Sequence, residues 1–305
     1  LLWRLDSPGG PQRVEVSYLT NSLNWKSDYV MVLNEDDDEG ALTGWVTLTN
    51  RSGTAYENAR LQLVAGDVRR VSGGGRPDVY RERMMDMAMA AEADGFTEDA
   101  FFEYHLYTLG RPTDLMNNEQ KQVTLLESSG FGVEKTLIFS GSQYYYRGQY
   151  GQITSNEKVG VYLDFENSES NGLGMPLPKG TVRVYKRDHT GAQQFIGEDL
   201  IDHTPRDETL RIKMGEAFDV VGDRRQMDYT VISSCVSEST WRVDLRNHKD
   251  EDVEVTIVEP VGGDWEILSS THGTELRDAF TFMMTPEVEA RGETRVEYRV
   301  RVRWC

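Results

Sequence analysis

Apolar and polar residues alternate with a period of two along most of the chain, which is typical of half-buried β-strands. The alternation is visible over residues 14–18, 42–48 and 161–167, and it is most regular over residues 295–304. Turn-forming Asn, Gly and Pro residues separate these segments. The pattern predicts a mostly β protein, namely a multi-unit antiparallel β-sandwich with an Ig-like C-terminal unit.

One segment breaks the strand pattern. After Pro77, the run DVYRERMMDMAMAAEADG places methionines and alanines at helical spacing, and Gly95 ends it. We expect one short helical excursion there. The predicted organisation is a main β domain over residues 1–76 and 101–228, the excursion over 77–100, and an Ig-like β-sandwich over 229–305.

Composition and charge narrow the function classes. A chain of 305 residues is long enough for more than one core. A net charge of -18 argues against nucleic-acid binding and against an anionic membrane surface. No apolar run is long enough to span a bilayer, so no transmembrane segment is predicted. The opening LLWRLD has neither Met nor a leader pattern, which predicts a trimmed start.

Two cysteines leave two alternatives open. Cys235 and Cys305 lack metal-type spacing. One disulfide would suit an oxidising compartment, whereas two inert thiols would suit any compartment.

The stretch 180–229 combines strand patterns with a group of histidines and carboxylates. His189, His203 and Asp202 are weak candidates for metal ligands, because imidazole and carboxylate from separate loops can hold a divalent ion. His203 with Asp202 or Glu198 is a weak candidate for a general base. Against both, no HExxH spacing and no nucleophile motif accompany them. Turn formation and cross-strand pairing explain the same residues, so we predict no catalytic residue, metal or cofactor.

Two further groups are candidates for contacts with a partner. Exposed tyrosines can stack on sugar rings, although strand tyrosines more often bury their rings; the cluster comprises Tyr144, Tyr145, Tyr146 and Tyr150. Arginines on the outward face of the last strand would suit an anionic partner or the acidic surface of another copy, or else pair with local carboxylates; they are Arg295, Arg299, Arg301 and Arg303.

Several longer motifs carry a resemblance to a known family. They include VEVSYLTNSLNWKSDY, GWVTLTNRSGTAYENARLQLVAGDV, EYHLYTLGRPTDLMNNEQKQVTLL, PLPKGTVRVYKRD, FIGEDLIDHTP, MGEAFD and LRNHK. With these motifs the chain resembles, over nearly its whole length, the bacterial mucoidy-inhibitor-A-like family of domains of unknown function. The resemblance implies a β-rich, exported or envelope-associated protein, and it supplies no catalytic residues.

The leading hypothesis is therefore a non-enzymatic, extracytoplasmic structural or protein-interaction module of the bacterial envelope or cell surface. Its expected partners are proteins, including other copies of itself that assemble through sheet edges. Two alternatives stay open: a glycan-binding module that uses Tyr144–Tyr150, and a metal-dependent hydrolase around His189 and His203.

Overall fold

The computed structural model describes residues 9–10, 14–66, 95–154 and 158–305, and it confirms a mostly β fold. Within those ranges the helical content is limited to two 3-10 turns, η1 (Gln143–Arg147) and η2 (Glu169–Asn171). No helix in the described ranges is long and apolar enough to cross a membrane. The helix expected after Pro77 lies outside the described residues up to position 94. Residues 96–100 of the predicted excursion belong instead to strand β5 (Phe96–Phe101).

The strand expected over residues 14–18 is wrong. These residues have no regular structure and are exposed, and the first strand begins only at Leu23. An alternating sequence forms a stable strand only where a neighbour supplies hydrogen bonds and a buried face.

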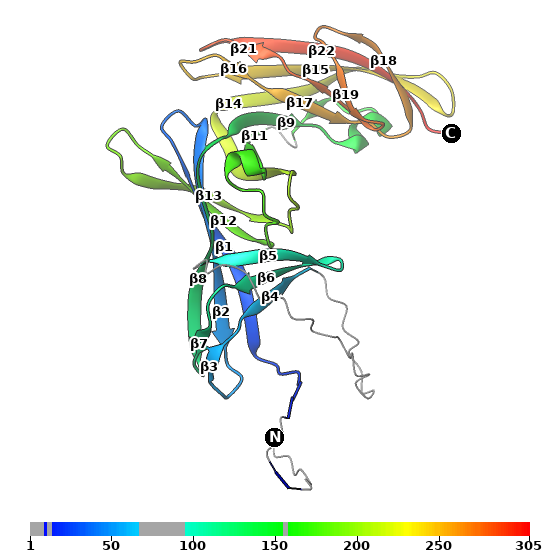
Figure 1. Cartoon of the computed structure of the whole chain (residues 1–305). Helices are drawn as coiled ribbons and strands as arrows, with labels where there is room; N and C mark the ends of the chain where they lie inside the picture. The colour runs from blue at the N-terminus through cyan, green and yellow to red at the C-terminus, as the bar shows by residue number, and fades with distance from the viewer. Residues whose placement is uncertain (1–8, 11–13, 67–94, 155–157) are drawn as a thin grey trace.

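The N-terminal part of the chain forms a five-stranded sheet in the order β13-β12-β1-β2-β8 (Figure 1). All neighbours are antiparallel except β1 and β12. Small sheets β4-β6-β5 and β3-β7 accompany it. The bounds are β1 (Leu23–Leu33), β2 (Glu39–Asn50), β3 (Tyr56–Ala59), β4 (Gln62–Ala65), β6 (Tyr104–Leu109), β7 (Thr113–Leu115), β8 (Glu119–Gly132), β12 (Gly180–Arg187) and β13 (Gln193–Ile201).

The C-terminal part forms a second, ten-stranded sheet in the order β18-β22-β15-β14-β11-β9-β17-β20-β19, with β10 paired to β14. Its two ends pack against each other across a core, since the Phe282 ring of β20 lies 5.5 Å from both Trp265 of β18 and Tyr298 of β22. This is a sandwich arrangement (Figure 1). The turn at residues 247–250 does not close a hairpin, because β15 pairs with β14 and β22 while β16 pairs with β21.

The strands of this second part have the following bounds: β9 (Glu134–Ser140), β10 (Gln152–Ile153), β11 (Lys158–Glu166), β14 (Thr209–Val231), β15 (Val236–Asn247), β16 (Val253–Glu254), β17 (Thr256–Pro260), β18 (Asp264–Ser270), β19 (Glu275–Asp278), β20 (Thr281–Met284), β21 (Glu287–Val288) and β22 (Glu293–Arg303).

Two strands belong to both hydrophobic cores. β11 contributes Leu163 and Phe165 to the first core and Val159 to the second. β14 is 23 residues long; its Leu210 and Ile212 lie in the first core, and its Val220 lies in the second. The second core also takes residues between Leu137 and Val159. The two cores therefore meet along β11 and β14.

Three buried asparagines stand at strand ends. Asn50 and Asn247 make equivalent bonds: each Nδ2 donates to the carbonyl four residues ahead and to two carbonyls of a distant loop, and each Oδ1 accepts the N–H two residues ahead. Asn167 ties two other loops in a related way. These residues satisfy carbonyls that the strands leave unpaired, which explains the recurring Asn at the ends of β2 and β15.

Candidate interaction surface

The two histidines proposed as metal ligands do not come together. His189 lies in the turn between β12 and β13, and His203 follows the opposite end of β13. β13 is 9 residues long, so the two histidines flank opposite ends of a strand that spans roughly 26 Å. No cluster of three or more His, Cys, Asp or Glu residues able to hold a metal occurs in the described ranges. The Glu198 carboxylate instead pairs with Arg183 at 3.2 Å, and Thr204 donates to the backbone carbonyl of Asp202, as expected for cross-strand pairs and turns.

His203 lines a cavity of about 220 Å³ together with His105, a residue that sequence reasoning did not single out. The Nδ1 atom of His105 lies 2.7 Å from the Glu98 carboxylate, which orients the ring. The lining contains no serine or cysteine, and the Thr204 hydroxyl donates to a backbone carbonyl. The geometry thus offers an oriented base without an activated nucleophile beside it.

The arginines of β22 are all paired with carboxylates. Arg295 contacts Asp244 at 2.7 Å, and Arg303 contacts Asp264 at 3.3 Å. Arg299 and Arg301 share Glu238. The hydrogen bond from Arg301 is the largest cause of the lowered pKa of Glu238, and the bond from Arg299 lowers it further. The face is an internal ladder of ion pairs, so its positive charge is already balanced.

The four clustered tyrosines separate into a buried pair and an exposed pair. Tyr145 and Tyr146 lie in the second core, where the Tyr146 hydroxyl donates to Glu259 at 2.9 Å. Glu259 is fully buried, and its other oxygen accepts a bond from the equally buried Arg224. A sugar-stacking surface that uses all four rings is therefore excluded. Tyr144 and Tyr150 remain exposed, with their ring centres 6.0 Å apart.

The loop that carries the exposed tyrosines is held in place from several directions. The side chain of Gln226 on β14 accepts the Tyr150 N–H at 2.5 Å and donates to the carbonyl of Gly148 at 3.0 Å. The Tyr150 hydroxyl donates to the carbonyl of Tyr144 at 3.2 Å. The guanidinium of Arg147 lies 5.4 Å from the centre of the Trp304 ring, a cation–π contact. The Tyr150 side chain is thus held by hydrogen bonding, and the Tyr144 ring packs edge-on against the Tyr145 ring at 4.6 Å.

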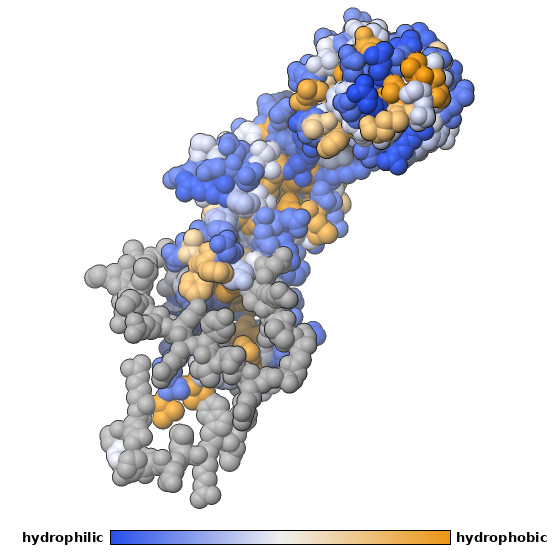
Figure 2. Space-filling view, turned by 90° about the vertical axis from the view of Figure 1, so that its right-hand side faces the viewer, coloured by the Kyte–Doolittle hydropathy of each residue, from blue (hydrophilic) through white to orange (hydrophobic). Residues whose placement is uncertain are grey.

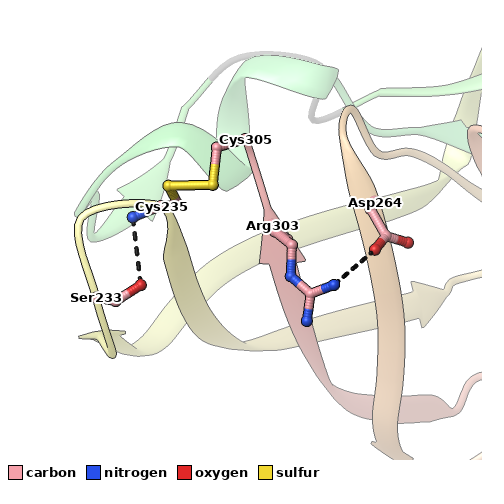
Figure 3. The surroundings of a disulfide bond; sticks show 5 residues. All are labelled: Ser233, Cys235, Asp264, Arg303 and Cys305. Carbon is pink, nitrogen blue, oxygen red and sulfur yellow. Dashed lines mark hydrogen bonds and ion pairs between the residues drawn. A yellow bond between two sulfur atoms is a disulfide. The ribbon is translucent and has the colours of Figure 1, made fainter.

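Beside this loop, a disulfide joins Cys235 to Cys305 (Figure 3). Their Cα atoms are 5.6 Å apart, within the usual range for disulfides. The bond connects the start of β15 to the end of β22, where the Trp304 N–H also donates to the carbonyl of Cys235 at 2.9 Å. Of the two alternatives that the sequence left open, the structure contains the disulfide.

Exposed apolar side chains occur on the segments that lead to the disulfide and on the connection between β19 and β20. Val231, Ile232 and Phe280 are 67%, 56% and 57% exposed, and Met227 and Trp304 are partly exposed. Figure 2, which faces this end of the molecule, shows several apolar patches among hydrophilic residues on the C-terminal sandwich. We call this surface the disulfide end: Tyr144, Tyr150, Met227, Val231, Ile232, Phe280 and Trp304. Sequence reasoning missed its aliphatic members, because Val231 is the last residue of β14 and Ile232 follows it, and alternation does not show that such residues stay exposed.

The sheet edges, in contrast, are irregular. Each edge strand of the two large sheets contains at least one residue left out of the pairing register: Ile196 in β13, Leu125 and Gly130 in β8, Leu268 in β18 and Arg277 in β19. Bulges at an edge twist it away from further strands, and natural proteins use them against edge-to-edge association. This arrangement disfavours the assembly through sheet edges that the sequence suggested.

Taken together, the fold and this surface define a mostly β protein with two cores and an exposed aromatic and aliphatic end. A comparison with models of protein families finds no match to the chain, and a search of curated proteins finds no similar protein. The resemblance to the mucoidy-inhibitor-A-like family therefore stays a prediction.

Proposed function

We propose that this chain is an exported, non-enzymatic interaction module that binds a protein partner through the disulfide end. The observation that carries the proposal is the exposure of Val231, Ile232 and Phe280 beside two tyrosines held by hydrogen bonds. Exposed apolar groups that gather at one place mark interaction sites on soluble proteins. A loop that is ordered in advance also loses less conformational entropy on binding.

The chemistry of the surface favours a protein over a glycan. The Tyr144 and Tyr150 rings meet at 74°, so they do not form one flat platform for a sugar. The neighbouring aliphatic side chains offer no hydrogen bonds to sugar hydroxyls. A protein surface with an apolar centre suits both features, since tyrosines combine an apolar ring with a polar hydroxyl.

The disulfide supports the exported location. Disulfides form and persist in oxidising compartments and are rare in a reducing cytosol. The family resemblance, which is itself a prediction, points the same way to the bacterial envelope or cell surface. Labelling of the natively purified chain with a thiol reagent should detect no free cysteine.

A site-specific photo-crosslinker tests the proposed surface in the producing cell. With the probe at position 232, we expect a discrete protein adduct that disappears when Phe280→Glu is added. The matched control places the probe at Phe218, a residue of β14 that is 93% exposed and lies outside the disulfide end. Equal adducts at both positions, or none at position 232, would refute the proposal.

The same experiment separates the other occupants of this surface. An adduct with twice the mass of the chain, together with a dimer in light scattering, would make the partner a second copy. Binding on a glycan array that is lost on Tyr144→Ala and retained in Ile232→Glu would replace the protein by a sugar.

A further inference from the structure

A second cavity lies where β9, β11 and β14 meet. Its volume is about 410 Å³, which falls in the range of about 300–1,000 Å³ that small-molecule sites occupy. β9 contributes Ser140, β11 contributes Lys158 and Tyr162, and β14 contributes Lys213 and Glu216. Three strands of one sheet therefore position its polar groups.

Several polar groups of this cavity have unused hydrogen-bonding capacity. Across the described ranges, the hydroxyls of Ser140, Thr154 and Tyr162 take part in no side-chain hydrogen bond, and the ammonium group of Lys158 makes no ion pair. Lys213, in contrast, pairs with Glu216 at 2.9 Å, and that hydrogen bond raises the pKa of the lysine. Donors that are unused by the protein and converge on one cavity are available to a ligand.

Gly160 gives the cavity its aromatic wall. A Cβ atom at this position would lie 2.8 Å from the Tyr162 ring, so only glycine lets the ring rest against the strand. The pairing of β11 with β14 is irregular at the same place, because Lys158 pairs with Val221 whereas Gly160 pairs with Glu216. Residues 217–220 of β14 are left out of the pairing with β11, so the sheet is locally open beside the Tyr162 ring and the two lysines.

The charges define the kind of ligand. Lys158 and Lys213 contribute two positive charges and Glu216 one negative charge, so the lining carries a net charge of +1 in a chain of net charge -18. A single carboxylate would balance this charge. The two negative charges of a phosphate dianion would exceed it and would be repelled by Glu216. The three hydroxyls suit a ligand that carries hydroxyl groups of its own.

We propose that this cavity binds a small hydroxylated monocarboxylate, such as a polyol acid, with its carboxylate on Lys158 and its hydroxyls on Ser140 and Thr154. The proposal goes beyond the protein-binding function of the disulfide end, and either can hold without the other.

Calorimetric titration of the full chain with gluconate tests this assignment, and sorbitol serves as the uncharged counterpart. We expect millimolar binding of gluconate that weakens with added salt and no binding of sorbitol. Lys158→Gln should weaken gluconate binding about fivefold or more, because a charge-assisted hydrogen bond is lost. The matched control is Lys121→Gln on β8, where the ammonium donates to the carbonyl of Asp114 at 2.8 Å.

Three results would overturn the assignment: no gluconate binding at tens of millimolar, equal binding of sorbitol, or unchanged binding by Lys158→Gln. Lys158 is exposed, so its substitution leaves the core intact. Retention of the wild-type melting temperature in both variants confirms that any loss is local.

Discussion

The disulfide supports a quantitative prediction about the stability of the C-terminal sandwich. It joins residues separated by 70 positions, and a cross-link of that span reduces the entropy of the unfolded chain by an amount worth about 4 kcal/mol at 25 °C. Total stabilities of domains are about 5–15 kcal/mol. Cys235→Ser combined with Cys305→Ser should therefore remove a large fraction of the stability of this unit.

The effect should be confined to the second core. The segment enclosed by the disulfide runs from β15 to β22, and the first core contains none of it. Unfolding in urea, followed by tryptophan fluorescence, should show two transitions. With a denaturant slope of about 2 kcal/mol per M, the midpoint of the transition that reports on buried Trp241 should fall by roughly 2 M.

Two controls make this prediction strict. Ser233→Ala, next to the disulfide, should leave both midpoints in place, because its hydroxyl makes only a 3.3 Å bond to the Cys235 N–H. Adding a reducing agent to the wild type should reproduce the double variant. An unchanged second midpoint, or an equal fall of both midpoints, would refute the reasoning that the bond acts on the unfolded C-terminal segment.

Three further predictions concern the interior and the ion-pair ladder. Glu259→Gln leaves the buried guanidinium of Arg224 without a counter-charge, and urea unfolding should show that the free energy of unfolding falls by about 3–5 kcal/mol. If the double change Arg224→Met with Glu259→Leu costs more than this single change, the account is wrong. Asn247→Ala removes a donor that three carbonyls share and should cost about 3 kcal/mol, whereas a loss below about 1 kcal/mol would show that water replaces it. The pKa of Glu238 is lowered in the folded protein, so the stabilisation by its ion pairs is complete above the ordinary carboxyl pKa and is lost as pH falls through the folded-state value. Melting temperatures measured between pH 3 and 7 should therefore fall less steeply below pH 4.5 in Glu238→Gln than in the wild type. Parallel curves would contradict this prediction.

Strand periodicity predicted much of the fold, because a half-buried strand must alternate. The segments at 161–167 and 295–304 match β11 and β22 except for their last residues, since these strands end at Glu166 and Arg303. The same signal failed at residues 14–18, where no strand in the described part of the chain completes the ladder. Local alternation cannot show whether a partner strand is present.

The candidate sites were harder to predict, because they depend on strand register between distant segments. The acidic partner of Arg295 is Asp244, a residue 51 positions away on β15. Burial divides four tyrosines that look alike in sequence into two core residues and two surface residues. Likewise, only the length of β13 shows that His189 and His203 lie far apart.

The continuity of β14 has a mechanical consequence. This strand of 23 residues spans roughly 73 Å, beginning in the first core and ending at Val231 beside the disulfide end. A pull applied by a bound partner would pass along one covalent backbone that is flanked on both sides by hydrogen-bonded neighbours over part of its length. Such a load shears many hydrogen bonds together instead of opening them one after another. The strand would thus transmit tension from the surface contact into the distant core.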